Sequence, residues 1–160
     1  MSLITIYENN IHMVFEITEG GQLKLLHFSA LPFNGEEIKA RSLEGSFNLV
    51  EADIAGLDRP LERHGTKYIV TAPGYRMKYE SHKDYRNSLG RKLEFITFDE
   101  GTGLSVTSHL QFFDGISVIR SWSEVVNKGS EVQTLTYISS FNYTGIEKEG
   151  ILPRDKKMSL

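Results

Sequence analysis

The sequence predicts an all-β domain built as an antiparallel β-sandwich. Three observations point to this class. Apolar and polar residues alternate with a period of two along several segments, turn-forming residues separate these segments at short intervals, and no stretch of ten or more residues has the apolar spacing of an amphipathic helix. With 160 residues the chain is long enough for one domain with a sizeable core. A closed barrel would show a similar pattern, but the spacing favours the sandwich.

The N-terminal part predicts short strands joined by tight turns. Residues 4–7, 12–18 and 23–29 are rich in β-branched and other apolar side chains. Glu8-Asn9-Asn10 and Glu19-Gly20-Gly21-Gln22 separate them with typical turn residues. Another strand is predicted at 47–52, and a further one at 91–98.

The clearest strand pattern follows at 104–113. Leu104, Val106, Leu110 and Phe112 share one face, as expected for a half-buried strand. Asp114-Gly115 predicts a type I′ hairpin turn into a return strand at 116–126, in which we expect Trp122 to belong to the core. After a turn at 127–130, residues 135–141 alternate again, so these three strands are predicted to form a meander.

The segment 53–87 differs from the rest of the chain. It is rich in polar, charged and aromatic side chains, and it shows little alternation. A long irregular connection in a compact domain usually carries function, because loops on a rigid scaffold hold most binding residues. We therefore expect the chemistry of this protein in this segment.

Composition and motifs exclude several classes of function. Eighteen Lys and Arg against 21 Asp and Glu give a net charge of −3, which disfavours a general nucleic-acid binder. No apolar run reaches membrane-spanning length and no signal peptide is visible, so we expect a protein that is soluble, cytoplasmic and without membrane contacts. Cysteine is absent, the five histidines form no metal-binding motif, and no nucleotide-binding loop occurs, so we expect neither metal nor cofactor.

Sugar recognition fits the side chains of the irregular segment. Flat aromatic rings cover the apolar faces of a sugar, and charged side chains bind its hydroxyls. A polar protein–protein interface would use the same residue types, so both functions stay open on this evidence. The side chains concerned are Tyr68, Tyr75, Tyr79 and Tyr85 together with Asp58, Arg59, His64 and Lys67.

An ordered set of short motifs resembles the N-terminal domain of bacterial glycoside hydrolase family 36 α-galactosidases. The most specific part runs from Thr102 to Gly129, and the resemblance covers roughly residues 22 to 155. The motifs are His64-Gly65-Thr66-Lys67, Pro73-Gly74-x-Arg76, Tyr79-x-Ser81-His82 ahead of Arg86-Asn87, Gly90-Arg91-Lys92-Leu93-Glu94, Asp99-x-x-Thr102-Gly103-Leu104-x-Val106-x-Ser108-His109, Gln111-Phe112-Phe113-Asp114-Gly115 and Val118-Ile119-Arg120-Ser121-Trp122-Ser123-Glu124-Val125-x-Asn127-x-Gly129.

The resemblance implies a non-catalytic β-supersandwich domain that precedes a catalytic barrel. It implies that both catalytic aspartates lie on the barrel, outside this chain, and that a loop of this domain reaches the sugar pocket of a neighbouring subunit. The matching loop here is 53–67, so the implied substrate-binding residues are Asp58, Arg59, His64, Lys67 and Asp53. The family often has Gly-Asp-x-Arg in this loop, where this chain has Gly56-Leu57-Asp58-Arg59.

We therefore expect residues 1–160 to form a single sandwich domain that is a fragment of a longer glycosidase, with the last strands of the sandwich beyond its end. The expected partners are α-galactosides, the catalytic barrel and neighbouring subunits, and the chain alone is expected to lack turnover. Two alternatives remain open, namely a stand-alone carbohydrate-binding module and a purely structural or interaction domain.

Overall fold

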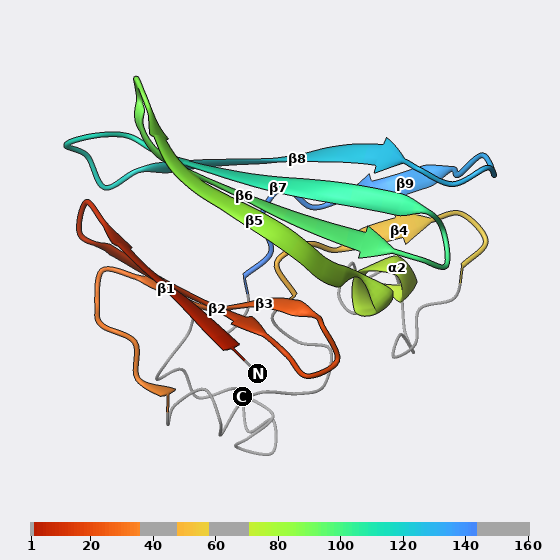
Figure 1. Cartoon of the computed structure of the whole chain (residues 1–160), viewed down its shortest axis with the longest axis horizontal. Helices are drawn as coiled ribbons and strands as arrows, with labels where there is room; N and C mark the ends of the chain where they lie inside the picture. Colours follow the sequence, from red (N-terminus) through yellow and green to blue (C-terminus); the bar gives the residue numbers. More distant parts are fainter. Residues whose placement is uncertain (1, 36–47, 58–70, 144–160) are drawn as a thin grey trace, which may run out of the picture.

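The computed structural model describes residues 2–35, 48–57 and 71–143. Nearly all of its regular structure consists of strands (Figure 1). In chain order the elements are β1 (Ser2–Glu8), β2 (Ile11–Ile17), β3 (Leu23–Ser29), β4 (Ala52–Ile54), α2 (Ala72–Arg76), β5 (Lys78–Asn87), β6 (Gly90–Asp99), β7 (Leu104–Phe112), β8 (Ile119–Asn127) and β9 (Leu135–Ile138). The all-β sandwich predicted from the sequence is confirmed.

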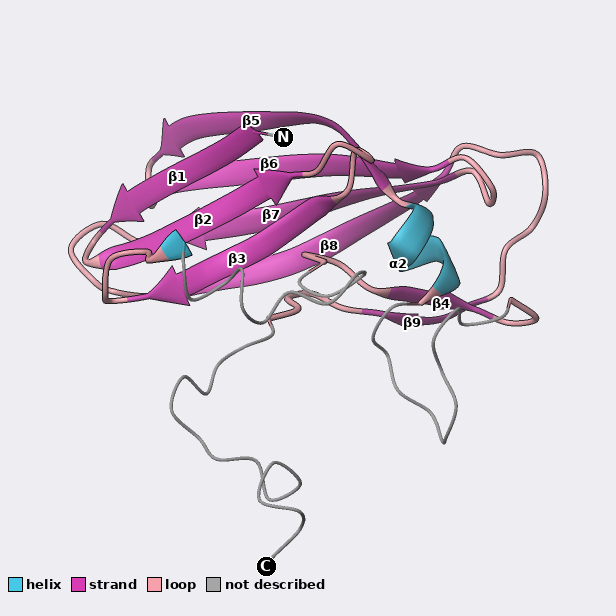
Figure 2. Ribbon diagram, turned by 90° about the horizontal axis from the view of Figure 1, so that it is seen from below, coloured by secondary structure: helices cyan, strands magenta, loops and turns pink. Residues whose placement is uncertain are grey.

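Every strand pairing is antiparallel, and the strands form three sheets. β5, β6, β7 and β8 pair in sequence order, β1, β2 and β3 form a second sheet, and β4 pairs with β9. Figure 2 shows β1–β3 lying across the β5–β8 sheet, with β4 and β9 beside α2. A bridge between Lys24 and Asn48 connects β3 to the chain that leads into β4.

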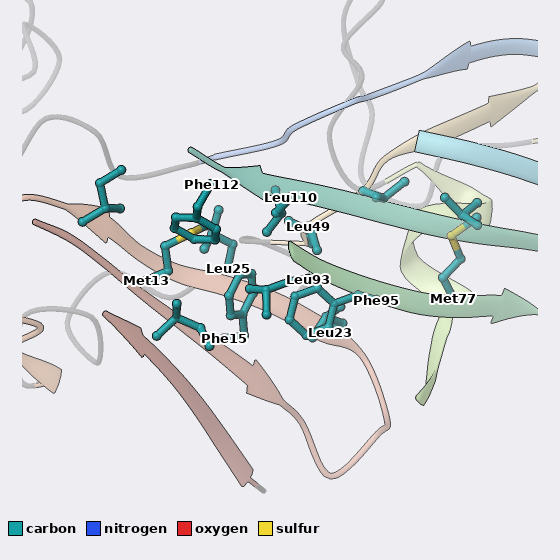
Figure 3. Close-up of a cluster of buried hydrophobic side chains, with 14 of the residues drawn as sticks. Met13, Phe15, Leu23, Leu25, Leu49, Met77, Leu93, Phe95, Leu110 and Phe112 are labelled. Atoms are coloured by element: carbon teal, nitrogen blue, oxygen red, sulfur yellow. The ribbon is translucent and has the colours of Figure 1, made fainter. Parts of the chain in front are cut away.

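The hydrophobic core fills the space between the β1–β3 and β5–β8 sheets. Met13, Phe15 and Leu25 come from one sheet and are fully buried. They meet side chains of β6 and β7, and the rings of Phe15 and Phe95 lie 4.6 Å apart (Figure 3). The alternation read from the sequence thus produces one apolar face on each sheet, and these two faces pack against each other.

Most predicted strands are confirmed within one or two residues, but the irregular structure predicted for 53–87 is wrong where the structure describes residues 71–87. This part contains helix α2 and the ten-residue strand β5. β5 is an edge strand, and nearly all of its residues are exposed. Exposed edge strands carry charged residues on both faces, so the alternation that identifies a half-buried strand is absent there.

Three further predictions about local structure need correction. Six residues, not two, separate β7 from β8, and Asp114 lacks the positive φ of a type I′ turn, although Gly115 has φ 80°. β9 pairs with β4 and not with β8, so the predicted three-strand meander ends at β8. The strand predicted at 47–52 lies at Ala52–Ile54 instead.

Trp122 does not belong to the core either. It is half-buried on the outer face of the β5–β8 sheet, where its ring stacks on His109. The register pairs Trp122 with His109 across β7 and β8, and these two positions face away from Leu110 and Val106. The apolar residues around Trp122 in the sequence do not show which face of the sheet it occupies, because successive strand residues point to opposite faces.

Candidate functional site

The structure describes one of the five predicted sugar-binding residues. Asp53 lies in β4, and its carboxylate accepts a hydrogen bond of 2.5 Å from the hydroxyl of Thr136. Asp58, Arg59, His64 and Lys67 lie outside the described residues, between Leu57 and Thr71. The part of the site that the structure shows is therefore the frame that holds the two ends of this segment.

A buried polar network holds Thr71, the first described residue after Leu57. Glu51 is 1% exposed, and its Oε2 accepts hydrogen bonds from the backbone N–H of Thr71 at 2.9 Å and from the hydroxyl of Thr71 at 2.5 Å. Its Oε1 accepts from the side-chain amide of Asn48 at 3.2 Å. A buried carboxylate is costly unless it is hydrogen-bonded, so these bonds fix Thr71 firmly beside β4.

Thr71 also begins the short helix α2. Its backbone is extended, and its hydroxyl oxygen accepts a hydrogen bond from the N–H of Gly74 at 3.2 Å, as in a helix N-cap. A Cβ on Gly74 would clash with Oε2 of Glu51, so only glycine permits this close approach. The Thr71-Ala72-Pro73-Gly74 sequence therefore builds a compact corner against β4.

A groove lies beside α2 at the end of the β5–β8 sheet. Its volume is about 800 Å³, which is in the range of ligand-binding clefts. We call it the α2 groove. Its main side chains are Gln22 after β2, Tyr75 and Arg76 of α2, Lys78 and Glu80 of β5, and Phe98 near the end of β6.

Arg76 is held in one position within this groove. Its Nε and Nη2 donate to the two carboxylate oxygens of Asp99 at 2.9 and 2.8 Å. Asp99 is fully buried and also accepts hydrogen bonds from Thr102 Oγ1 and from the N–H of Gly101. Bidentate pairing of this kind fixes the plane of a guanidinium as well as its position.

A second polar cluster covers the outer face of the β5–β8 sheet. Glu94 is its centre, with the hydroxyl of Tyr85 and Nζ of Lys92 both 2.8 Å from Oε1. Partial burial raises the pKa of Glu94, but hydrogen bonds from Lys92 and Tyr85 outweigh it and lower the pKa from the ordinary 4.5 to about 2. His109 lies 3.4 Å from Glu94 and stacks on Trp122 with ring centroids 4.7 Å apart. Tyr85 and Lys92 thus hold Glu94 in place on the sheet surface, whereas neither ring nitrogen of His109 makes a hydrogen bond to a described residue.

Sequence reasoning found part of the α2 groove and missed the rest. Tyr75 and Arg76 belong to the segment that we singled out, and Arg76 is in a motif of the family resemblance. Gln22 and Phe98 were predicted only as parts of a turn and a strand, and Asp99 only as part of a turn and of a motif of the family resemblance. The turn Asp99-Glu100-Gly101 brings the buried carboxylate of Asp99 to Arg76, 23 residues earlier, and no local pattern signals such a pairing.

Within the described ranges, no group of three histidines or carboxylates is arranged to hold a metal ion, and no helix is long and apolar enough to cross a membrane.

The antiparallel sheets packed face to face define the class of this chain as an all-β sandwich domain. The same fold occurs in three solved structures of the glycoside hydrolase family 36 α-galactosidase AgaA from Geobacillus stearothermophilus. One is the enzyme by itself, one is a variant in complex with 1-deoxygalactonojirimycin, and one is a doubly substituted variant in complex with raffinose. Each matches with a TM-score of 0.55 and 13% sequence identity.

Each match covers 84% of this chain and 23% of the enzyme chain. The chain thus spans about a quarter of the length of these enzymes. No protein-family model and no curated protein sequence matches the chain. The resemblance to family 36 α-galactosidases noted in the sequence is confirmed at the level of the fold.

Proposed function

We propose that this chain is the accessory β-sandwich domain of a family 36-like α-galactosidase. In this proposal the chain performs no hydrolysis alone. It supplies sugar-contacting side chains from residues 53–67 to a pocket that a catalytic barrel and a neighbouring subunit complete, and it carries contacts between subunits. The intact enzyme would remove terminal α-galactosyl units with retention of configuration.

The observation that carries the proposal is the fold match over 84% of this chain to about a quarter of a family 36 enzyme. The motifs from Thr102 to Gly129 support it independently, because they come from the sequence. The buried bonds between Glu51 and Thr71 add a physical reason, since they hold one end of the 58–70 segment on a rigid frame.

The proposed roles follow from the chemistry of sugar hydroxyls. The carboxylate of Asp58 and the guanidinium of Arg59 can each bind two neighbouring hydroxyls, and His64 and Lys67 add further polar contacts. Asp53, whose carboxylate is bound to Thr136, is a weaker candidate for direct contact. Hydroxyl pairing discriminates strongly between sugars, because a missing partner leaves a buried polar group unpaired.

The experiment uses the full polypeptide encoded by the gene, assayed with 4-nitrophenyl α-galactoside. Asp58→Ala and Arg59→Ala are expected to lower kcat/KM by about 10- to 100-fold, the usual cost of losing a charged hydrogen bond. Asp84→Ala is the matched control, because it breaks an exposed Asp–Arg pair with Arg91 in β5 and β6. The 160-residue chain by itself should show no turnover.

Two results would refute the proposal. One is hydrolysis of the α-galactoside by the 160-residue chain alone. The other is a kcat/KM for Asp58→Ala and Arg59→Ala that equals the value for Asp84→Ala.

A further inference from the structure

The α2 groove is a preformed cleft, and its described lining comes from the turn before β3, from α2, and from the ends of β5 and β6. Its volume of about 800 Å³ is enough for a ligand larger than a single sugar unit. None of the described residues 53–57 lines the groove.

The groove presents a fixed hydrogen-bond donor. Two nitrogens of Arg76 bind the buried Asp99, while the side chain of Arg76 stays 40% exposed. Among the described residues, Nη1 of Arg76 makes no hydrogen bond, so it is available to a ligand. Because Asp99 holds the guanidinium in place, little side-chain entropy is lost when Nη1 binds.

The guanidinium of Arg76 can take this position because residue 101 is glycine and has no side chain. A Cβ at residue 101 would lie 2.9 Å from Nε of Arg76 and 3.2 Å from Nη2. A methyl group there would displace the guanidinium without removing its charge. Gly101 therefore offers a way to test the position of Arg76 separately from its presence.

The charges around the groove disfavour an ionic ligand. Arg76 is neutralised by Asp99, Lys78 adds a positive charge, and Glu80 and Glu100 add two negative charges. Lys128 lies 3.6 Å from Glu80 and balances it. An anion would meet the carboxylates and a cation would meet Arg76 and Lys78, whereas a hydroxyl can both donate to the carboxylates and accept from the cations.

Two half-buried aromatic side chains complete the chemistry. Tyr75 and Phe98 both line the groove, and they come from α2 and β6 respectively. Aromatic rings beside groups that donate and accept hydrogen bonds match a ligand with apolar ring faces and many hydroxyls. Gln22 adds a fixed amide, because its Nε2 donates to the carbonyl oxygen of Tyr75 at 3.1 Å.

We propose that the α2 groove binds a neutral oligosaccharide on this chain alone. Its described lining shares no residue with the described part of the 53–67 segment. Its effect would be to hold a longer saccharide on the domain surface by contacts that the terminal sugar does not make.

The test is a titration of the ¹⁵N-labelled 160-residue chain with raffinose, followed by NMR. We expect saturable shift changes confined to the amides of residues 20–22, 75–80 and 98–101. Tyr75→Ala and Gly101→Ala are each expected to weaken binding by about 5-fold or more, because the first removes a ring contact and the second displaces Arg76. Should Tyr75→Ala fail to fold, Gly101→Ala still decides the question.

The control for the aromatic variant is Tyr85→Ala, which removes a tyrosine that is 39% exposed on the outer face of the sheet. It should bind raffinose as the unchanged chain does. Asp58→Ala should also leave this binding unchanged, so a loss of binding there would assign the saccharide to the 53–67 pocket and overturn the groove. Absence of saturable shifts, equal shifts with glycerol, or full binding by Gly101→Ala would each overturn the proposal as well.

Discussion

The two faces of the β5–β8 sheet belong to the same strands but are stabilised by different forces. On the inner face, Leu93, Phe95 and Leu110 are fully buried against the β1–β3 sheet. On the outer face, Lys92, Glu94 and His109 alternate with them and form the polar cluster beside Trp122. Each strand therefore uses one set of residues for packing and the neighbouring set for polar contacts.

No other described strand packs on the outer face of the β5–β8 sheet, yet its central charges are well shielded. The side chain of Glu94 is only 13% exposed and that of Lys92 only 16%, because the rings of Tyr85 and Trp122 lie on either side of the Lys92 ammonium. Lys92 Nζ is 5.8 Å from the Tyr85 ring centroid and 5.1 Å from that of Trp122. The polar face thus shields the charges of Lys92 and Glu94, which pair with each other.

The largest expected effect is the loss of packing on the inner face. Phe95→Ala should destabilise the chain by about 3 to 5 kcal/mol, because it leaves a cavity beside Phe15. Urea denaturation followed by the fluorescence of Trp122, the only tryptophan, measures this change. Ile96→Ala, at the next position on the outer face, is the control and should cost about 1 kcal/mol. Equal costs for the two variants would mean that the faces do not differ as described.

Removing the charge at the centre of the outer face should have an intermediate, pH-dependent effect. The folded chain holds the pKa of Glu94 at about 2, below its ordinary 4.5, so the ionised carboxylate contributes stability above pH 4.5 that is lost as pH falls toward 2. Glu94→Gln should therefore cost about 1 to 3 kcal/mol at neutral pH and progressively less at acid pH.

Urea denaturation of both proteins at several pH values checks this expectation. Glu124→Gln is the matched control, because the Glu124 side chain is 66% exposed and contacts His109 at 3.5 Å from the other side. It should cost less than about 0.5 kcal/mol at any pH. A cost for Glu94→Gln that does not change with pH would show that the hydrogen bonds around Glu94 stabilise the sheet independently of its charge.

The smallest effect is expected at the rim of the same cluster. Lys83→Ala removes an ammonium that is 67% exposed and 3.6 Å from Oε2 of Glu94. Exposed ion pairs contribute little, so the stability should fall by at most about 0.5 kcal/mol. A larger fall in the urea midpoint would show that the network is coupled out to its exposed edge.

The prediction of strands from the sequence depended on how each strand is buried. β6 was predicted closely because its residues alternate between buried and half-buried positions, which produces a clear period of two. β5 was missed because it is an edge strand with polar residues on both faces. The partner of β9 was also missed, since β4 lies about 80 residues earlier in the chain.

The candidate site was predictable only in part for the same reason. Tyr75 and Arg76 attracted attention through their local composition, but the pairing of Arg76 with Asp99 depends on a turn that follows another strand. The Glu51–Thr71 network likewise joins residues 20 positions apart. Such contacts leave no periodic signal, because nothing in a local pattern says which carboxylate will meet which donor.

The sequence by itself determined the all-β class, most strand positions and the likeness to family 36 α-galactosidases, because alternation and ordered motifs are local properties of the chain. Only the tertiary structure decided which face Trp122 occupies, which strand pairs with β9, and that Tyr75, Arg76 and Phe98 line one groove. The physical reason is that these features depend on packing between strands far apart in the chain, where burial and buried hydrogen bonds select one arrangement among many compatible with the same local pattern.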